Sequence, residues 1–232
     1  SDALSDSLRN IEQDLSGDSS GLGGLIDELE EAAEQSGVAS DYLQVSISGR
    51  SVTMWDVPKS QWFYSHVLAL TELGIVSGYK DASGNPTGAY GPGDNVTREQ
   101  ALKIALGSAG VNEANCSGEA ASQVSAWARQ YSVCANQMGF GIEGKNLQEP
   151  ASRAELLHYV LAAFAVNVPE GTPPFADSAS HMYKNDIAYG YALEIVSGDK
   201  NADGTMKGTF RPDANVNRAE TAKIAKLAIE LL

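Results

Sequence analysis

A short motif that occurs three times constrains the fold of this 232-residue chain more than any other feature. The copies read Val-Thr-Arg-Glu-Gln at 96–100, Ala-Ser-Arg-Ala-Glu at 151–155 and Val-Asn-Arg-Ala-Glu at 216–220. An apolar pattern with helical spacing follows each copy, and a second helical pattern precedes it. A helix–loop–helix unit of this size cannot bury its own apolar face, so the units must pack together. We therefore expect a mainly all-α fold built from three helix-loop-helix repeats.

The second residue of each copy has a side-chain oxygen that is well suited to cap a helix. A Gln or Glu stands three residues later, which completes the reciprocal capping box. The pairs are Thr97 with Gln100, Ser152 with Glu155, and Asn217 with Glu220. This pattern predicts that a helix begins directly after each capping residue.

The upstream helix of the first two repeats ends in glycine-rich sequence, at 74–78 and at 139–141. The third repeat reads Glu-Ile-Val-Ser-Gly at 194–198. Glycine at such a position suits a left-handed helix terminus or a close approach of another group to the backbone. Residues 42–49 alternate between apolar and polar side chains, which predicts a short strand.

Several further motifs recur in the same order around these helices. Repeat 1 contains Asp56-Val57-Pro58, Trp62, Gly74 to Gly78 and Tyr90-Gly91-Pro92 before its arginine motif. Repeat 3 contains Phe175-Ala176-Asp177, Ile195 to Gly198, Asp203-Gly204 and Phe210-Arg211-Pro212. Repeat 2 keeps Trp127, Gly139 and Ser152 to Glu155. Over roughly residues 53–232, this composite motif resembles the S-layer homology family.

The resemblance implies three repeats in a pseudo-threefold arrangement around a central helical bundle. The helical spacing of Leu4, Leu8, Ile11 and Leu15 separately predicts an N-terminal helical segment. It also implies a non-catalytic module that anchors its protein to the cell envelope by binding cell-wall polysaccharide in grooves between the repeats. We expect an N-terminal segment or linker at 1–48 and repeats at 49–111, 112–168 and 169–232. Repeat 2 lacks an obvious Phe-x-Asp, so we expect its groove to be weaker or silent.

The repeated arginine, Arg98, Arg153 or Arg218, falls at the first helical position, where a cation opposes the helix dipole. One interpretation is that each guanidinium binds an anionic ligand. The alternative is an internal ion pair with Asp56 or Asp177, and the five donors of a guanidinium allow both. The tryptophans likewise suit either stacking on sugars or packing in the core.

We expect the main groove to be built around repeat 1, with a neighbouring repeat as its other wall. Its residues would be Asp56, Trp62, Gly78 and Arg98, and its ligand an acidic or ketal-bearing sugar, because a guanidinium fork prefers a carboxylate. The full set of candidate ligand-binding residues is Asp56, Trp62, Gly74, Gly78, Arg98, Trp127, Arg153, Asp177 and Arg218.

The chain has two cysteines, Cys116 and Cys134, without the close spacing of a metal site. A disulfide is the favoured interpretation and would place the protein outside a reducing cytosol. Two buried free thiols are the alternative. The start of the chain has neither an initiator Met nor a signal-like stretch, which is typical of a mature or truncated product.

Asp199, Asn201 and Asp203 follow the spacing with which an EF-hand loop begins, so a calcium site is a candidate cofactor site. The twelfth position of this loop is Phe210 rather than Glu. A polar turn rich in Asp and Asn is the alternative interpretation.

The negative charge of the chain and the absence of catalytic motifs argue against several other functions. The net charge is −14 and there is no run of Lys or Arg, which argues against nucleic acid and anionic membranes as partners. No apolar stretch approaches the length of a membrane span. No catalytic motif is present, so we expect no enzyme. The runner-up function is a structural S-layer or envelope protein that uses the module for protein–protein assembly with envelope partners.

Overall fold

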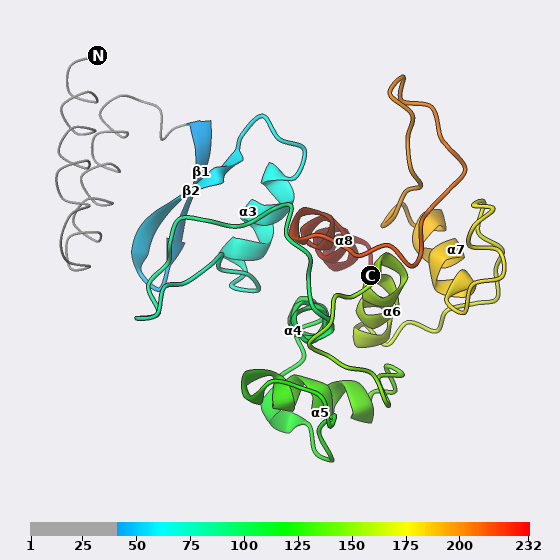
Figure 1. Ribbon diagram of the computed structural model, residues 1–232, viewed down its shortest axis with the longest axis horizontal. Helices are drawn as coiled ribbons and strands as arrows, with labels where there is room; N and C mark the ends of the chain where they lie inside the picture. The colour runs from blue at the N-terminus through cyan, green and yellow to red at the C-terminus, as the bar shows by residue number, and fades with distance from the viewer. Residues whose placement is uncertain (1–40) are drawn as a thin grey trace. The chain divides into compact units, whose positions relative to one another are not determined.

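The computed structural model describes residues 41–232, so most of the segment expected at 1–48 lies outside the described residues. The described chain contains a two-stranded sheet and six α-helices, which confirms a mainly helical fold (Figure 1). The elements are β1 (Tyr42–Ile47), β2 (Arg50–Pro58), α3 (Tyr64–Glu72), α4 (Arg98–Ser108), α5 (Arg129–Gln137), α6 (Arg153–Ala163), α7 (Lys184–Ala192) and α8 (Arg218–Leu231). Two short 3-10 helices, Glu113–Asn115 and Ala126–Ala128, precede α5.

The described residues divide into two compact units. Unit 1 comprises residues 41–68 and 77–90, and unit 2 comprises residues 69–76 and 91–232. Unit 2 contains the three arginine motifs, both cysteines and helices α4 to α8.

Unit 1 contains an antiparallel hairpin in which β1 pairs with β2. Ser48 and Gly49 form its turn with positive φ angles. In β1 the buried residues Leu43, Val45 and Ile47 alternate with exposed ones, which confirms the strand expected from the pattern. β2 was not expected, because its consecutive buried residues 52–54 lack the alternation of a half-buried strand.

The three helices expected after the capping residues are present as α4, α6 and α8. In each helix the cap oxygen accepts from the N–H three residues later, and the side chain there accepts from the N–H of the cap. All three capping boxes are therefore complete, and the sequence prediction of these helix starts is confirmed.

The segments that lead into these helices bond to one another in a closed ring. Val96 N donates to Val216 O at 3.0 Å, Val216 N donates to Ala151 O at 3.1 Å, and Ala151 N donates to Val96 O at 2.8 Å. The first amide of each helix is also satisfied: Arg98 N donates to Glu149 O, Arg153 N to Ala214 O and Arg218 N to Asp94 O, each at 2.9 Å. A helix start normally leaves such amides without a partner, so the ring supplies acceptors that the helices lack.

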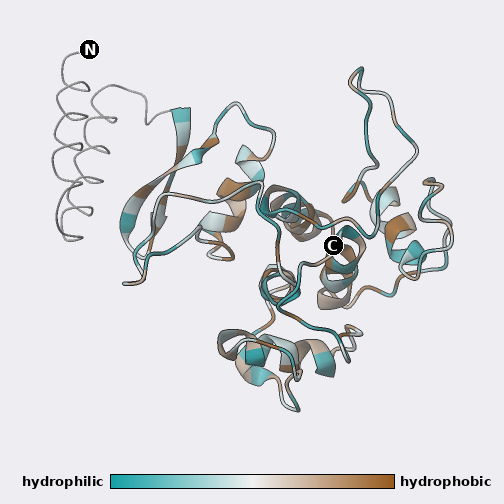
Figure 2. Cartoon of the chain, in the orientation of Figure 1, coloured by the Kyte–Doolittle hydropathy of each residue, from teal (hydrophilic) through white to brown (hydrophobic). Residues whose placement is uncertain are grey.

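The core of unit 2 surrounds α6, which is buried on almost all sides because it contacts α4, α7 and α8. Tyr159 of α6 is fully buried and stacks on Phe140 with 5.9 Å between the ring centroids. By contrast, Figure 2 shows hydrophobic positions of α7 in brown beside hydrophilic ones in teal. Of this amphipathic helix, Ile187 and Gly190 are buried.

Cys116 and Cys134 form a disulfide, as the sequence predicted. It ties the loop at the start of repeat 2 to α5, where Cys134 is fully buried. The alternative of two free thiols is therefore wrong.

Candidate functional site

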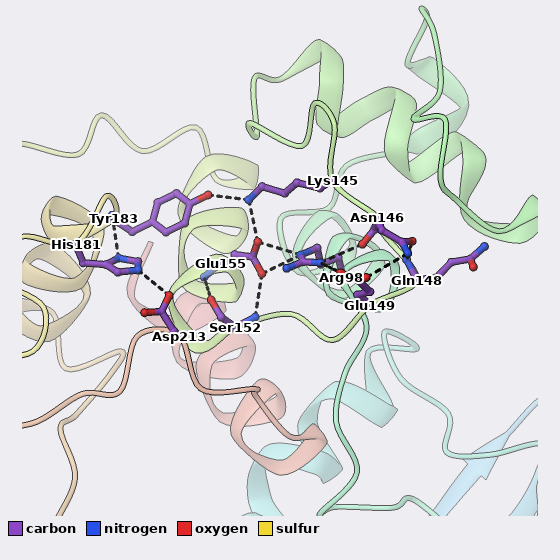
Figure 3. Close-up of polar contacts among 10 residues, drawn as sticks. All are labelled: Arg98, Lys145, Asn146, Gln148, Glu149, Ser152, Glu155, His181, Tyr183 and Asp213. Carbon is purple, nitrogen blue, oxygen red and sulfur yellow. Dashed lines mark hydrogen bonds and ion pairs between the residues drawn. The ribbon is translucent and has the colours of Figure 1, made fainter.

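A polar cavity of about 180 Å³ lies in unit 2, where the loops before α6 and α8 meet the N-terminal ends of α6 and α7. Figure 3 shows its polar contacts. The lining residues are Arg98, Lys145, Pro150, Ser152, Glu155, His181, Met182, Tyr183, Asp213 and Asn215. Of the candidate ligand-binding residues, Arg98 lies in this cavity.

Glu155 is the centre of the polar network (Figure 3). Its carboxylate accepts from its own cap residue Ser152, from Arg98 Nε at 3.0 Å and from Lys145 Nζ at 2.8 Å. Burial alone would raise the pKa of Glu155, but the hydrogen bonds from these donors outweigh it and hold the pKa below its usual value. The Glu of the α6 capping box is therefore also the acceptor for two cations.

Arg98 uses part of its guanidinium for this network. Nη1 donates to Asn146 O at 3.1 Å and to Glu149 Oε2 at 3.2 Å, while Nε is bound to Glu155. Nη2 makes no hydrogen bond to any described residue. Arg98 therefore forms an internal ion pair, but its acceptors are Glu155 and Glu149 rather than the Asp56 or Asp177 expected from the sequence, and one donor group of the fork is still available to a ligand.

Arg153 is bound more completely within the protein. Its Nη1 donates to Glu220 Oε1 at 2.7 Å and its Nε to Phe210 O at 3.0 Å. The guanidinium also lies 4.9 Å from the centre of the Phe210 ring, and burial lowers its pKa. Arg98 and Arg153 thus bind the capping Glu of the following repeat, an acceptor that the sequence analysis missed. The signal was the Glu two positions after the repeated arginine in repeats 2 and 3.

The other wall of the cavity comes from the start of α7. Lys145 Nζ donates to Tyr183 Oη at 3.1 Å, and the Tyr183 ring stacks on His158 with 4.5 Å between centroids. Tyr183 N donates to His181 Nδ1, which leaves His181 Nε2 to donate to Asp213 Oδ1 at 3.2 Å. Burial opposes the charge of Lys145, yet its hydrogen bonds to Glu155 and Tyr183 raise its pKa.

Asp56 and Asp177 hold equivalent loop positions in their own repeats. Asp56 Oδ1 accepts from Tyr90 N at 2.8 Å, and Asp177 accepts from Phe210 N at 3.0 Å and Arg211 N at 2.8 Å. These carboxylates fix the loop that leads to the arginine motif, a role that the sequence analysis did not anticipate.

The candidate tryptophans and glycines lie in different surroundings. Trp62 is 55% exposed and Trp127 is 50% exposed, so the interpretation of both as core residues is wrong. Gly78 has a positive φ, and a Cβ there would lie 2.7 Å from Ala89 O, so the backbone itself requires glycine. Gly74 lines a second cavity of about 190 Å³ in unit 2, together with Lys103 and Tyr131.

The four residues expected to form the main groove are distributed over both units. Asp56, Trp62 and Gly78 belong to unit 1, whereas Arg98 belongs to unit 2, and the groove drawn from all four stays a prediction. Ligand binding by Arg218 also stays a prediction.

The calcium candidates lie in the loop before α8. Asp199 accepts from Arg211 Nε and Nη2 at 2.9 Å each, and Asp203 accepts from Thr205. Within residues 41–232 no group of three His, Cys, Asp or Glu is arranged to hold a metal ion. A calcium ion at Asp199 would therefore have to compete with Arg211.

The decisive comparison is with protein families. The S-layer homology domain model matches residues 56–102 and 174–222. These two matches support a relationship between this chain and the S-layer homology family. S-layer homology domains are generally non-catalytic modules that bind cell-wall polymers and anchor proteins at the cell surface. The segment between the two matches, which includes the expected second repeat, is not matched. No curated protein matches the chain.

The two matched segments cover most of the expected first and third repeats. The first segment includes Arg98 of the cavity, and the second includes His181, Tyr183 and Asp213. Within the described residues, no helix is both long enough and apolar enough to cross a membrane.

Proposed function

We propose that this chain is a non-catalytic module of an exported protein and anchors it to the cell envelope. Its ligand is a cell-wall polysaccharide with an acidic or ketal-bearing sugar, bound in grooves between repeats. The observation that carries this proposal is the polar cavity at Arg98, which is lined by residues of both segments that match the S-layer homology domain model.

We also propose that the helix pairs form three equivalent repeats around a pseudo-threefold axis. Two sets of contacts support this arrangement. The amides of Val96, Ala151 and Val216 close a ring in which each segment donates to the next. In addition, Arg98 binds Glu155 and Arg153 binds Glu220, so each arginine donates to the capping-box Glu of the next repeat in the sequence, in the sense opposite to the amide donations of the ring.

The chemistry of the cavity fits an acidic sugar in two ways. Arg98 Nη2 keeps its N–H donors, and Arg98 and Lys145 both line the cavity, so a carboxylate there can accept a charge-assisted hydrogen bond between two cations. Asp213, whose side chain is 88% exposed, and Asn215 offer acceptors to sugar hydroxyls. Exposed Met182 supplies an apolar surface at the same opening.

A pull-down with purified wall sacculi tests the proposal directly. The chain should sediment with intact sacculi and stay in the supernatant when the wall polysaccharide has been removed chemically from the same preparation. Equal sedimentation with both preparations would contradict polysaccharide binding.

The second candidate function is protein–protein assembly within an envelope layer. Large apolar side chains favour it, because Leu73 is 60% exposed and Met182 is 78% exposed. This function predicts self-association or binding to extracted envelope proteins, which sedimentation equilibrium in the absence of wall material would detect.

Calcium at Asp199, Asn201 and Asp203 is a further proposal and rests on their spacing. Calcium that binds only the folded chain should raise the melting temperature, and Asp203→Ala should abolish that gain. An unchanged melting temperature of the wild type in calcium would refute it.

A further inference from the structure

The chain contains two Asn-x-Ser/Thr sequences that satisfy the acceptor pattern for N-linked glycosylation. They are Asn95-Val96-Thr97 and Asn115-Cys116-Ser117. A third, Asn85-Pro86-Thr87, is excluded because proline occupies its middle position. In the structure, the first two sequences differ in whether their side chains already make hydrogen bonds within the protein.

In the first sequence the hydroxyl is committed to the fold. Thr97 Oγ1 accepts from Gln100 N as the cap of α4, and Val96 is buried within the closed ring of backbone bonds. An enzyme that engaged both Asn95 and the Thr97 hydroxyl would have to break the helix cap and the ring.

The second sequence is open. Asn115 and Ser117 are exposed, and neither side chain makes a hydrogen bond within the described part of the chain. The loop backbone is held from α5 instead: Gln130 Nε2 donates to Glu113 O and Cys116 O, and Gln137 Oε1 accepts from Ser117 N. The loop is therefore held in place without the use of either side chain.

The disulfide anchors the residue that lies between Asn115 and Ser117. Cys116 has an extended backbone, with φ −87° and ψ 142°, and its own side chain is bonded to the buried Cys134. Asn115, the last residue of the 3-10 helix Glu113–Asn115, and Ser117 flank this cysteine, and both are exposed. The two residues that the acceptor sequence requires are therefore accessible on either side of an anchored cysteine.

We propose that Asn115 is a glycosylation site of this protein. In the reaction, Asn115 Nδ2 forms a bond to the anomeric carbon of a diphosphate-activated sugar. The bond between that carbon and the phosphate oxygen breaks, the diphosphate leaves with the bond electrons, and a transferase base takes the amide proton. The modification requires export, as the disulfide indicates, but it does not depend on wall binding.

Mass spectrometry of the protein isolated from its own envelope tests the proposal. After the disulfide has been reduced, cleavage at Lys103 and Arg129 releases a peptide that contains Asn115 and lacks Asn95. This peptide should carry the added mass of a glycan. Asn115→Gln and Ser117→Ala should remove the added mass, whereas Ser117→Thr and the control Asn95→Gln should keep it.

An unmodified peptide from the wild-type envelope protein would overturn the proposal, and so would added mass that persists in Asn115→Gln. Sacculus binding, measured on the same samples, reports on the anchoring function separately, so failure of one proposal is distinguishable from failure of the other.

Discussion

Glu155 takes part both in the start of a helix and in contacts between residues that are far apart in the sequence. It completes the capping box of α6 and at the same time accepts from Arg98 and Lys145. Its side chain is only 9% exposed, so removal of its charge leaves two partly buried cations without their acceptor.

We therefore expect Glu155→Gln to lower the free energy of unfolding by about 2–3 kcal/mol, in the range for hydrogen bonds to charged groups. The matched control is Glu149→Gln, which removes a 61%-exposed partner of the same arginine and should cost less than about 1 kcal/mol. Urea denaturation of the two variants measures the difference, and equal losses would contradict the central position of Glu155.

The effect of Glu155 should depend on pH. Its pKa is lower in the folded chain than the ordinary value of 4.5, so its charge stabilises the fold above that value. As the pH falls through 4.5 toward the lower folded pKa, this contribution is lost. The gap in unfolding free energy between wild type and Glu155→Gln should be constant near neutral pH and shrink in acid. A gap that widens in acid would reverse the assigned sign.

Met182 permits a test of ligand binding that leaves the polar network intact. It is 78% exposed, lines the cavity and makes no polar contact, so Met182→Ala should hardly change stability. If a sugar covers it, lost apolar contact worth about 1 kcal/mol should weaken binding to wall polymer roughly fivefold. Met206→Ala, at a 46%-exposed site outside the cavity, is the control. If calorimetry shows that Met182→Ala binds wall polymer with unchanged affinity, the sugar does not contact this surface.

At the scale of elements, the helices of unit 2 differ in how they are stabilised. α6 is buried on most sides, whereas α5 has four buried residues and is also linked to its preceding loop by the disulfide. The covalent link substitutes for apolar contacts that a short helix with so few buried residues does not make.

The double variant Cys116→Ser/Cys134→Ser should therefore lower the free energy of unfolding by about 3 kcal/mol, as expected for a closed loop of this size. Thermal unfolding of the variant and the wild type measures the loss. With reductant present, the stability of the wild type should approach that of the variant. If the variant is as stable as the oxidised wild type, the disulfide does not stabilise the fold.

At the scale of the molecule, the closed ring of Val96, Ala151 and Val216 joins segments that are far apart in sequence. None of these amides belongs to a regular helix, yet they should open only when unit 2 unfolds as a whole. Hydrogen exchange followed by NMR should show all three among the slowest amides. The exposed-loop amide of Gly204, which donates to Asn201 O, should exchange much faster. Fast exchange at any ring amide would show that the ring opens locally.

The sequence by itself determined the features that depend on neighbours a few residues apart. The capping boxes at Thr97, Ser152 and Asn217 and the helices after them were predicted because cap and acceptor lie within one helical turn. The first strand followed from its alternation, and the disulfide followed because the chain has only two cysteines.

Tertiary structure alone decided the partners of those residues. Arg98 and Glu155 are 57 positions apart, and no local pattern shows that a capping carboxylate also binds the arginine of another repeat. Lys145, His181 and Tyr183 carry no motif, and they meet in one cavity only because loops before α6 and α8 bond to each other. The exposure of the tryptophans could not be predicted from the sequence either, because helical spacing indicates an apolar face but does not show whether another element covers it.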